Sequence, residues 1–167
     1  RWVLGYGHSS VAEHAVLHIA FENISRLACD TLEDNRLASY TEKSSRYQVI
    51  GAGSYHIPSE LTGNSVIRNE YIKTCDKLFS SYEQLLDKLQ LHLSKTNQQG
   101  PKEREGTYRL RLRREATDTC RFILPASTLT NVGVTMNARS VEHAVRKLLS
   151  SELLEEQAIG TEFKEQA

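Results

Sequence analysis

The segment from Val66 to Leu93 constrains the fold more than any other part of the sequence. Apolar residues recur along it at steps of three and four, and neither proline nor glycine interrupts it. This pattern predicts one long helix. A turn that ends at Gly100–Pro101 follows, and a second helix is expected from about Glu103 to Cys120. The centre of the chain is therefore predicted to be helical.

The N-terminal third mixes apolar residues in strand and helix periods. The expected elements are a short helix capped by Ser9 or Ser10, a strand over 16–21, a helix that starts at Asn23 or Ser25, and a strand over 46–50. The second of these helices has an apolar stripe at offsets of three, four and eight residues. It is expected to deliver Arg36 to its C-terminal end.

The C-terminal third has the same mixed character. Alternating apolar residues predict a strand over 129–136, and a helix capped by Ser140 is expected to reach about Leu154. The predicted fold class is therefore α+β, with a small, mostly antiparallel sheet flanked by long helices. Residues 1–167 are expected to form a single domain. Because the chain opens on Arg1 rather than methionine, we expect it to be a piece of a longer polypeptide.

Composition narrows the classes of partner. Lysine plus arginine and aspartate plus glutamate number 21 each, so no overall charge draws the protein to nucleic acid or to an acidic membrane. The 3 cysteines are far apart and form no Cys-x-x-Cys pair, which argues against a disulfide framework or a thiolate metal site. No apolar run approaches the length of about 20 residues that spans a bilayer. We expect a cytoplasmic protein with no metal, nucleic acid or membrane partner.

The segment from Ser39 to Tyr47, with Arg36 before it, is dense in groups that recognise anions. Ser44 and Arg46 suit a phosphate, and Glu42 could accept hydrogen bonds from sugar hydroxyls or ring nitrogens. These residue types favour a nucleotide or another anionic, hydroxyl-bearing ligand. The alternative is a polar surface turn.

Two histidines are also candidates for binding. His8 precedes a predicted helix N-terminus, where it could sit beside a phosphate or simply lie at the surface. His143 lies near Arg139 and could equally belong to a solvated helix face. The sequence contains neither a nucleophilic triad pattern nor a glycine-rich phosphate loop.

Four separate blocks of sequence resemble the flavin-dependent thymidylate synthases. The first block matches Gly-His-x-Ser/Thr-x-x-Glu-His, and the second matches the signature Arg-His-Arg-x-x-Ser-x-Asn-Glu-x-Ser-x-Arg-Tyr. The other two match later family segments. The blocks are Gly7–His14, Arg36–Tyr47, Arg121–Pro125 and Thr135–Ser140.

The resemblance implies a fold, a reaction and a set of ligands. Members of this family methylate dUMP to dTMP, with methylenetetrahydrofolate as the carbon donor, reduced FAD as the hydride donor and NADPH as a co-substrate. The family fold is an α/β domain in a homotetramer whose flavin sites are shared between subunits. By resemblance, FAD is the expected cofactor, dUMP and folate are the expected ligands, and a second copy or a fused domain is the expected partner.

The resemblance also assigns roles to individual residues. His8 and Arg36 would lie at the catalytic centre. The positions that would contact the flavin are His8, Ser10, Arg36, Asn137, Arg139 and His143. Those that would hold the nucleotide are Glu42, Ser44, Arg46 and Arg121.

Four positions stand out among those at which the sequence departs from the family pattern. Asp34-Asn35 replaces the first Arg-His of the signature, Thr31 replaces a glutamine, and Leu148 replaces an arginine that contacts the base. Replacing a cation by an anion is not conservative. Three hypotheses follow: a divergent synthase, a degenerate synthase-like domain with a nucleotide-binding, flavin-binding or structural role, and an unrelated α+β domain.

Overall fold

The structure is a computed structural model that describes residues 9–167. The chain divides into two compact units. The first, here called the sheet unit, comprises residues up to 42, His56–Gly63 and Leu129–Ala167. The second, here called the hairpin unit, comprises Lys43–Tyr55 and Asn64–Thr128.

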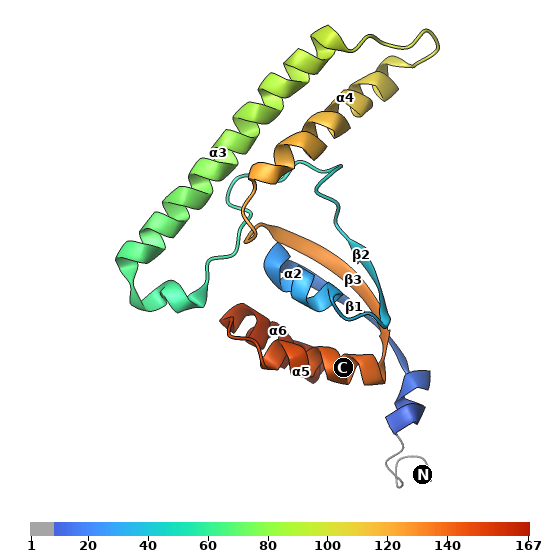
Figure 1. Cartoon of the computed structure of the whole chain (residues 1–167), viewed down its shortest axis with the longest axis vertical. Helices are drawn as coiled ribbons and strands as arrows, with labels where there is room; N and C mark the ends of the chain where they lie inside the picture. The colour runs from blue at the N-terminus through green and yellow to red at the C-terminus, as the bar shows by residue number, and fades with distance from the viewer. Residues whose placement is uncertain (1–8) are drawn as a thin grey trace. The chain divides into compact units, whose positions relative to one another are not determined.

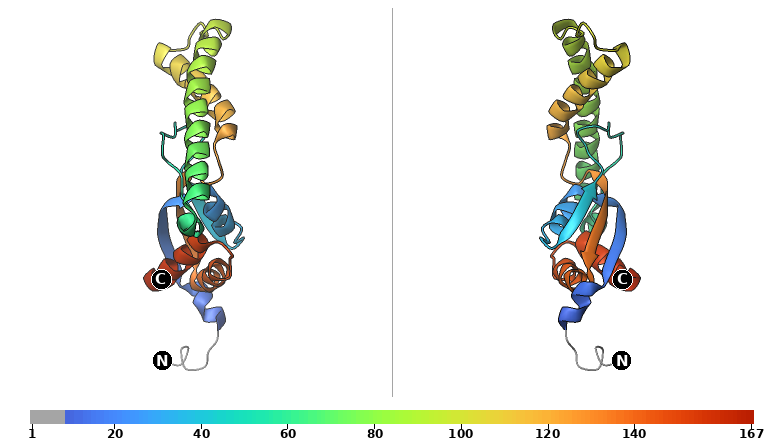
Figure 2. Two further views of the ribbon diagram at one scale, coloured as in Figure 1. Left: turned by 90° about the vertical axis from the view of Figure 1, so that its left-hand side faces the viewer. Right: turned by 90° about the vertical axis from the view of Figure 1, so that its right-hand side faces the viewer.

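The sheet unit is built on three antiparallel strands. They are β1 (Val16–Ser25), β2 (Ala38–Glu42) and β3 (Leu129–Asn137). The strand order is β1-β3-β2, so β3 lies between the other two, as the right-hand view of Figure 2 shows. Both pairings are antiparallel, which confirms the predicted fold class.

Helices complete the sheet unit (Figure 1). They are α2 (Arg26–Glu33), α5 (Ala138–Leu149) and α6 (Leu154–Gln166), with short 3₁₀ helices η1 (Ser9–His14) and η2 (Ser59–Gly63). On β3, Val132, Val134 and Met136 are buried while Gly133 is exposed, as expected of a strand with one core-facing side. These residues share a core with Phe21, Leu32, Leu148 and Phe163.

The crossing of α5 and α6 is unusually close. A Cβ atom added at Gly160 of α6 would lie 2.9 Å from the Cβ atom of Leu148. Leu148 is only 1% exposed. Glycine at position 160 therefore allows α6 to approach α5 and to complete the core of the sheet unit.

The hairpin unit consists mainly of two helices. The helices are α3 (Ser65–Thr96) and α4 (Glu105–Cys120), and a 3₁₀ turn η3 (Arg121–Ile123) follows. They enclose an apolar core of Tyr82, Leu86, Leu93, Leu112, Ala116 and Cys120. The long uninterrupted helix predicted from the sequence is confirmed.

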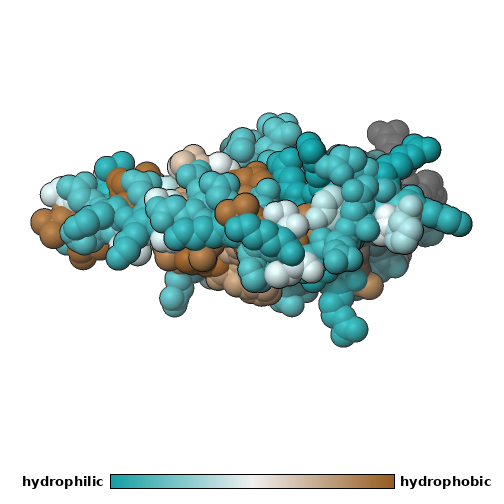
Figure 3. Space-filling model, turned by 90° about the horizontal axis from the view of Figure 1, so that it is seen from above, coloured by the Kyte–Doolittle hydropathy of each residue, from teal (hydrophilic) through white to brown (hydrophobic). Residues whose placement is uncertain are grey.

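The surface of the chain mixes polar and apolar residues. On the face drawn in Figure 3, hydrophobic residues are interspersed among hydrophilic ones. Large apolar side chains are exposed at several positions, including Phe122 at 80% and Leu37 at 78%. Over residues 9–167, no helix is both long enough and apolar enough to cross a membrane.

Three local expectations were wrong. The predicted strand over 46–50 is a turn, in which the carbonyl oxygen of Ser44 accepts hydrogen bonds from the amides of Tyr47 and Gln48, both at 3.3 Å. The second strand of the N-terminal third is instead β2, which overlaps the Ser39–Tyr47 segment that we interpreted as a ligand-binding loop. Asn137, not Ser140, caps α5, and α5 ends at Leu149, after which α6 begins as a separate helix.

Candidate functional site

Several predicted flavin residues meet at one end of the sheet. Val16 of β1 pairs with Asn137 at the end of β3, and Ala38 of β2 pairs with Met136. This register places Arg36, which precedes β2, close to the start of α5. Glu13 forms an ion pair with Arg139 and so joins the 3₁₀ helix that carries Ser10 to the same end of α5.

These residues differ in how firmly they are held. The side-chain oxygen of Asn137 accepts a hydrogen bond from the Ser140 amide at 2.9 Å and so caps α5. Arg36 is exposed and forms no ion pair or hydrogen bond with any described residue. His143, one turn beyond Arg139, is also exposed. His8, the remaining predicted flavin and catalytic residue, lies outside the described residues.

Glu42 lies at the opposite end of β2. It pairs with Val132, whereas the other end of β2 pairs with Met136. Its carboxylate accepts hydrogen bonds from Arg26 Nη1 at 2.8 Å, from Arg26 Nη2 at 3.4 Å and from Thr130 Oγ1 at 2.9 Å. The predicted nucleotide-binding glutamate is thus already hydrogen-bonded within the sheet unit.

Two further titratable groups lie beside Glu42. Burial and the nearby charge of Glu42 raise the pKa of Glu33, whereas Arg26 lowers it. Burial, followed by the charges of Glu42 and Glu33, raises the pKa of Cys29 to about 12. A thiol with this pKa is protonated at neutral pH, so Cys29 is a buried apolar residue rather than a nucleophile.

The remaining predicted nucleotide residues lie in the hairpin unit, and two of them meet there. The Nε atom of Arg121 donates to Asp118 Oδ1 at 2.9 Å, and the Nε atom of Arg46 lies 3.4 Å from the same oxygen. Ser44 belongs to the turn that carries Arg46, because its hydroxyl accepts a hydrogen bond from the Arg46 amide at 3.3 Å. Asp118 therefore gathers two arginines that are far apart in the sequence.

The contacts with Asp118 leave the outer edges of both guanidinium groups available. Each arginine uses only its Nε atom, and neither makes a hydrogen bond through its Nη atoms within the part of the chain that the structure describes. A guanidinium edge with two free N–H groups can bind a phosphate through two parallel hydrogen bonds. The Arg46 and Arg121 side chains, 59% and 22% exposed, are accessible to such an anion. A third cation, Arg114, lies over the ring of Tyr47 at 5.2 Å.

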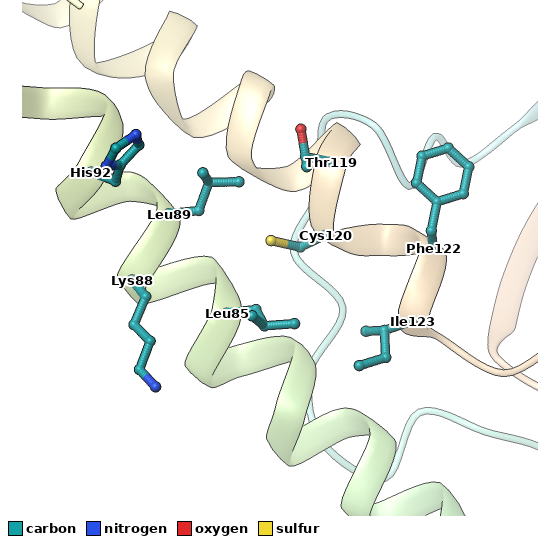
Figure 4. Close-up of a pocket in the computed structure, with 8 residues that line it drawn as sticks. All are labelled: Leu85, Lys88, Leu89, His92, Thr119, Cys120, Phe122 and Ile123. Carbon is teal, nitrogen blue, oxygen red and sulfur yellow. The ribbon is translucent and has the colours of Figure 1, made fainter. Parts of the chain in front are cut away.

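The hairpin unit also has an apolar groove that contains none of the predicted site residues. In Figure 4, Leu85 and Leu89 of α3 point toward Cys120 and Ile123. The groove has a volume of about 630 Å³. Its only polar side chains are Lys88, His92 and Thr119, which gives it no set of groups suited to a nucleotide.

Comparison with known protein families shows to which family the chain belongs. The sequence model of the family described as thymidylate synthase complementing protein matches residues 1–158. The chain belongs to this family. The resemblance identified from the four sequence blocks is thereby confirmed.

Individual relatives of this thymidylate synthase complementing protein family show the same relationship. A flavin-dependent thymidylate synthase of Thermococcus onnurineus is 35% identical over 142 residues, which cover 84% of this chain and 49% of the relative. A UPF0159 protein of Chlamydia muridarum is 32% identical over 160 residues, which cover 93% of this chain and 30% of the relative. The chain thus spans between about a third and a half of the length of these curated relatives.

The fold agrees with that of a solved structure. The crystal structure of thymidylate synthase X from Helicobacter pylori with FAD and dUMP matches with a TM-score of 0.58. The match covers 93% of this chain and 69% of the other, at 20% sequence identity. It establishes the shared fold.

The residues at the four positions that depart from the family pattern all make contacts within the sheet unit. Asp34 forms an ion pair with Lys147 of α5, and Lys147 also donates to the Thr31 carbonyl oxygen at 3.2 Å. The Lys147 contact lowers the pKa of the Asp34 carboxyl. The Thr31 hydroxyl donates to the buried Glu156 of α6 at 2.8 Å, and Leu148 lies in the core.

Asn35 completes this group of substitutions. It is 5% exposed, and its side-chain amide donates to the Leu32 carbonyl oxygen at 2.7 Å. Its side-chain oxygen is buried without a hydrogen-bond partner among the described residues. Asn35 therefore points into the sheet unit, not out toward a ligand.

Sequence reasoning missed three charged residues that hold the candidate site together. Asp118 lies three residues before Arg121, a spacing that brings side chains together on a helix and could have revealed it. Arg26 and Lys147 had no such signal, because their partners lie on other elements. Only the sheet register and the packing of α5 reveal these two pairings.

Proposed function

We propose that this chain is the nucleotide-binding part of a flavin-dependent thymidylate synthase. In this proposal it binds dUMP, and the complete protein methylates dUMP to dTMP with methylenetetrahydrofolate as carbon donor and NADPH as reductant of the flavin. The observation that carries the proposal is the pair of arginines, Arg46 and Arg121, gathered by Asp118 with their outer edges free.

The phosphate of dUMP is the group that this pair suits best. Two guanidinium groups beside one carboxylate leave a net positive charge, which attracts a phosphate dianion. Ser44, hydrogen-bonded to the Arg46 amide, adds a hydroxyl on the same turn. By the family resemblance, the Glu42 carboxylate of the sheet unit would accept a hydrogen bond from the sugar or base.

The residues at the other end of the sheet suit the diphosphate of FAD. Arg36 and Arg139 are exposed cations, and Ser10, Asn137 and His143 offer further polar groups. We propose that these five residues hold the cofactor. Reduced FAD would supply the hydride, while the role of this chain is to bind and orient the cofactor and the nucleotide.

The two predicted groups of the sheet unit are separated by the length of β2. Four residue steps in a strand span about 13 Å, so Glu42 and Arg36 cannot contact the same small group of a ligand. We therefore propose that a complete site combines one group from this chain with the other group from a second copy or a fused domain. Relatives much longer than this chain support that arrangement.

Calorimetry with dUMP and with deoxyuridine tests the nucleotide assignment. We expect Arg46→Ala and Arg121→Ala each to weaken dUMP binding by ~1.5–3 kcal/mol, because each removes a charge-assisted hydrogen bond to the phosphate. Deoxyuridine, which lacks the phosphate, should bind the variants and the unaltered chain equally. Arg109→Ala, which removes an exposed arginine of α4, is the matched control. Unchanged dUMP affinity in both variants would contradict the proposal.

A degenerate, non-catalytic domain is the second candidate. It is favoured by the contacts of the four substituted positions: Asp34 and Thr31 pair with other residues of the sheet unit, and Asn35 and Leu148 are buried in it. Flavin absorbance after reconstitution with FAD separates the two candidates, because only the first retains the cofactor. If the chain binds dUMP and cannot retain FAD, either alone or within the complete protein, the second candidate function is favoured.

A further inference from the structure

We propose that Arg26 is a positioning residue for Glu42: together with Thr130 it occupies Glu42 Oε1 and leaves Oε2 as the acceptor for a single N–H or O–H donor of a bound nucleoside monophosphate. The inference rests on the proposed function. It adds a residue that the signature does not contain and a specific role for each oxygen of the carboxylate.

The hydrogen bonds around Glu42 are unequal. Oε1 accepts from Arg26 Nη1 at 2.8 Å and from Thr130 Oγ1 at 2.9 Å, which uses both of its lone pairs. Oε2 accepts only from Arg26 Nη2, at 3.4 Å, a distance typical of a weak hydrogen bond. Glu42 retains 22% side-chain exposure, so a ligand can reach it. Oε2 can therefore accept a further hydrogen bond.

Both donors are held in place by the fold. Thr130 is 3% exposed and lies on β3, the interior strand. Arg26 is positioned by an irregularity in β1, where the register shifts between Phe21 and Ile24 and Asn23 adopts a positive φ of 56°. The strand then ends at Ser25, whose hydroxyl caps α2, and Arg26 becomes the first residue of that helix.

Helix stability does not explain an arginine at this position. The positive end of the helix dipole lies at the N-terminus, where a cation is unfavourable and an acidic residue is preferred. The first turn of α2 contains no acidic residue. Arg26 is stabilised instead by its ion pair with Glu42 of β2, to which both of its Nη atoms donate hydrogen bonds.

The surroundings of Glu42 need this cation. Glu33 of α2 also lies nearby, and Cys29 and Asp30 face Glu33 from the same helix. Among the residues that the structure describes, Arg26 is the one cation paired with Glu42. Without it, the described residues would leave Thr130 as the one hydrogen-bond donor to the Glu42 carboxylate. A Glu42 carboxylate held by one donor can rotate, so Oε2 would no longer be presented to a ligand in a fixed direction.

The test compares dUMP with two analogues that each lack one donor, the 3′-deoxy and the N3-methyl forms. In calorimetry, the unaltered 167-residue chain should bind dUMP about tenfold more tightly than one of them, and that analogue identifies the donor. In Arg26→Ala this ratio should fall below about twofold, and Arg26→Lys should restore part of it. Affinity for inorganic phosphate should not change. Arg146→Ala, an exposed ion-pair arginine of α5, should keep the full ratio.

Each failure has a separate meaning. A tenfold ratio that persists in Arg26→Ala would overturn the inference, as would an equal loss of affinity for dUMP and both analogues. Binding of dUMP by the unaltered chain without discrimination against either analogue would overturn the inference and leave the proposed function standing. No binding of dUMP at all would overturn both. If Arg26→Ala does not fold, Arg26→Gln provides the same comparison in a side chain of similar length.

Discussion

Replacing Gly160 by alanine should destabilise the sheet unit, although alanine is the better helix former. A Cβ atom at this position would lie 2.9 Å from Leu148 Cβ, 3.1 Å from the Leu149 amide nitrogen and 3.2 Å from Leu149 Cγ. The first two atoms are fixed to the α5 backbone and cannot rotate away. The two helices would have to separate for the methyl group to fit.

The magnitude follows from two opposing effects. Alanine stabilises a helix interior by about 1 kcal/mol relative to glycine. Forcing a methyl group into a packed contact costs about 1–3 kcal/mol. We therefore expect a net loss of up to about 2 kcal/mol in the free energy of unfolding. For a chain of this size, that loss lowers the melting temperature by up to about 8 °C.

Thermal and urea unfolding followed by circular dichroism measure this effect. The matched control is Gly106→Ala in α4, where an added Cβ atom meets no other atom within 4 Å. This control should be as stable as the unaltered chain or up to about 1 kcal/mol more stable. A Gly160→Ala variant as stable as the control would refute the close crossing of α5 and α6.

Three further outcomes are expected. Lys147 lowers the pKa of Asp34 below its ordinary value of 3.8. The unaltered chain should therefore be more stable than Asp34→Asn above that pH, and the difference should disappear as the pH falls through the lowered pKa. Melting temperatures of both chains across pH 2–7 measure this effect. Cys29, Cys75 and Cys120 are buried, so a thiol reagent at pH 8 should label the native chain far more slowly than the chain in urea; rapid native labelling would contradict their burial. Asn64→Ala should lower the stability of the hairpin unit by about 1 kcal/mol, because the Asn64 side chain accepts from the Ile67 amide and caps α3, and an unchanged urea midpoint would exclude that cap.

The elements that could be predicted from the sequence are those with a sustained period. The apolar repeat of α3 extends over many turns, and the alternation of β3 places every second residue in the core. In α6 the pattern is weaker, since Gly160 and several acidic residues interrupt it, and the segment resembles a polar tail. Packing against α5 stabilises α6 beyond what its own sequence indicates.

The candidate site shows a similar division. The residue types of the signature indicated an anionic ligand, but the same types concealed β2, because serine and threonine on the exposed face of a strand look like a loop. Local spacing could not reveal that Arg46 and Arg121 share Asp118, or that Asp34 pairs with Lys147. These contacts depend on tertiary placement, which a sequence period does not encode.

The position of β3 in the chain sets the order in which the protein can form during synthesis. β1 and β2 pair only with β3 in the described sheet, and β3 begins at Leu129, after the whole hairpin unit. The first two strands therefore remain unpaired while the ribosome synthesises α3 and α4. The helical hairpin depends on contacts between neighbours in sequence and can assemble early, whereas the sheet requires closure of a loop of about a hundred residues. During that interval the exposed edges of β1 and β2 are the segments on which a chaperone would act.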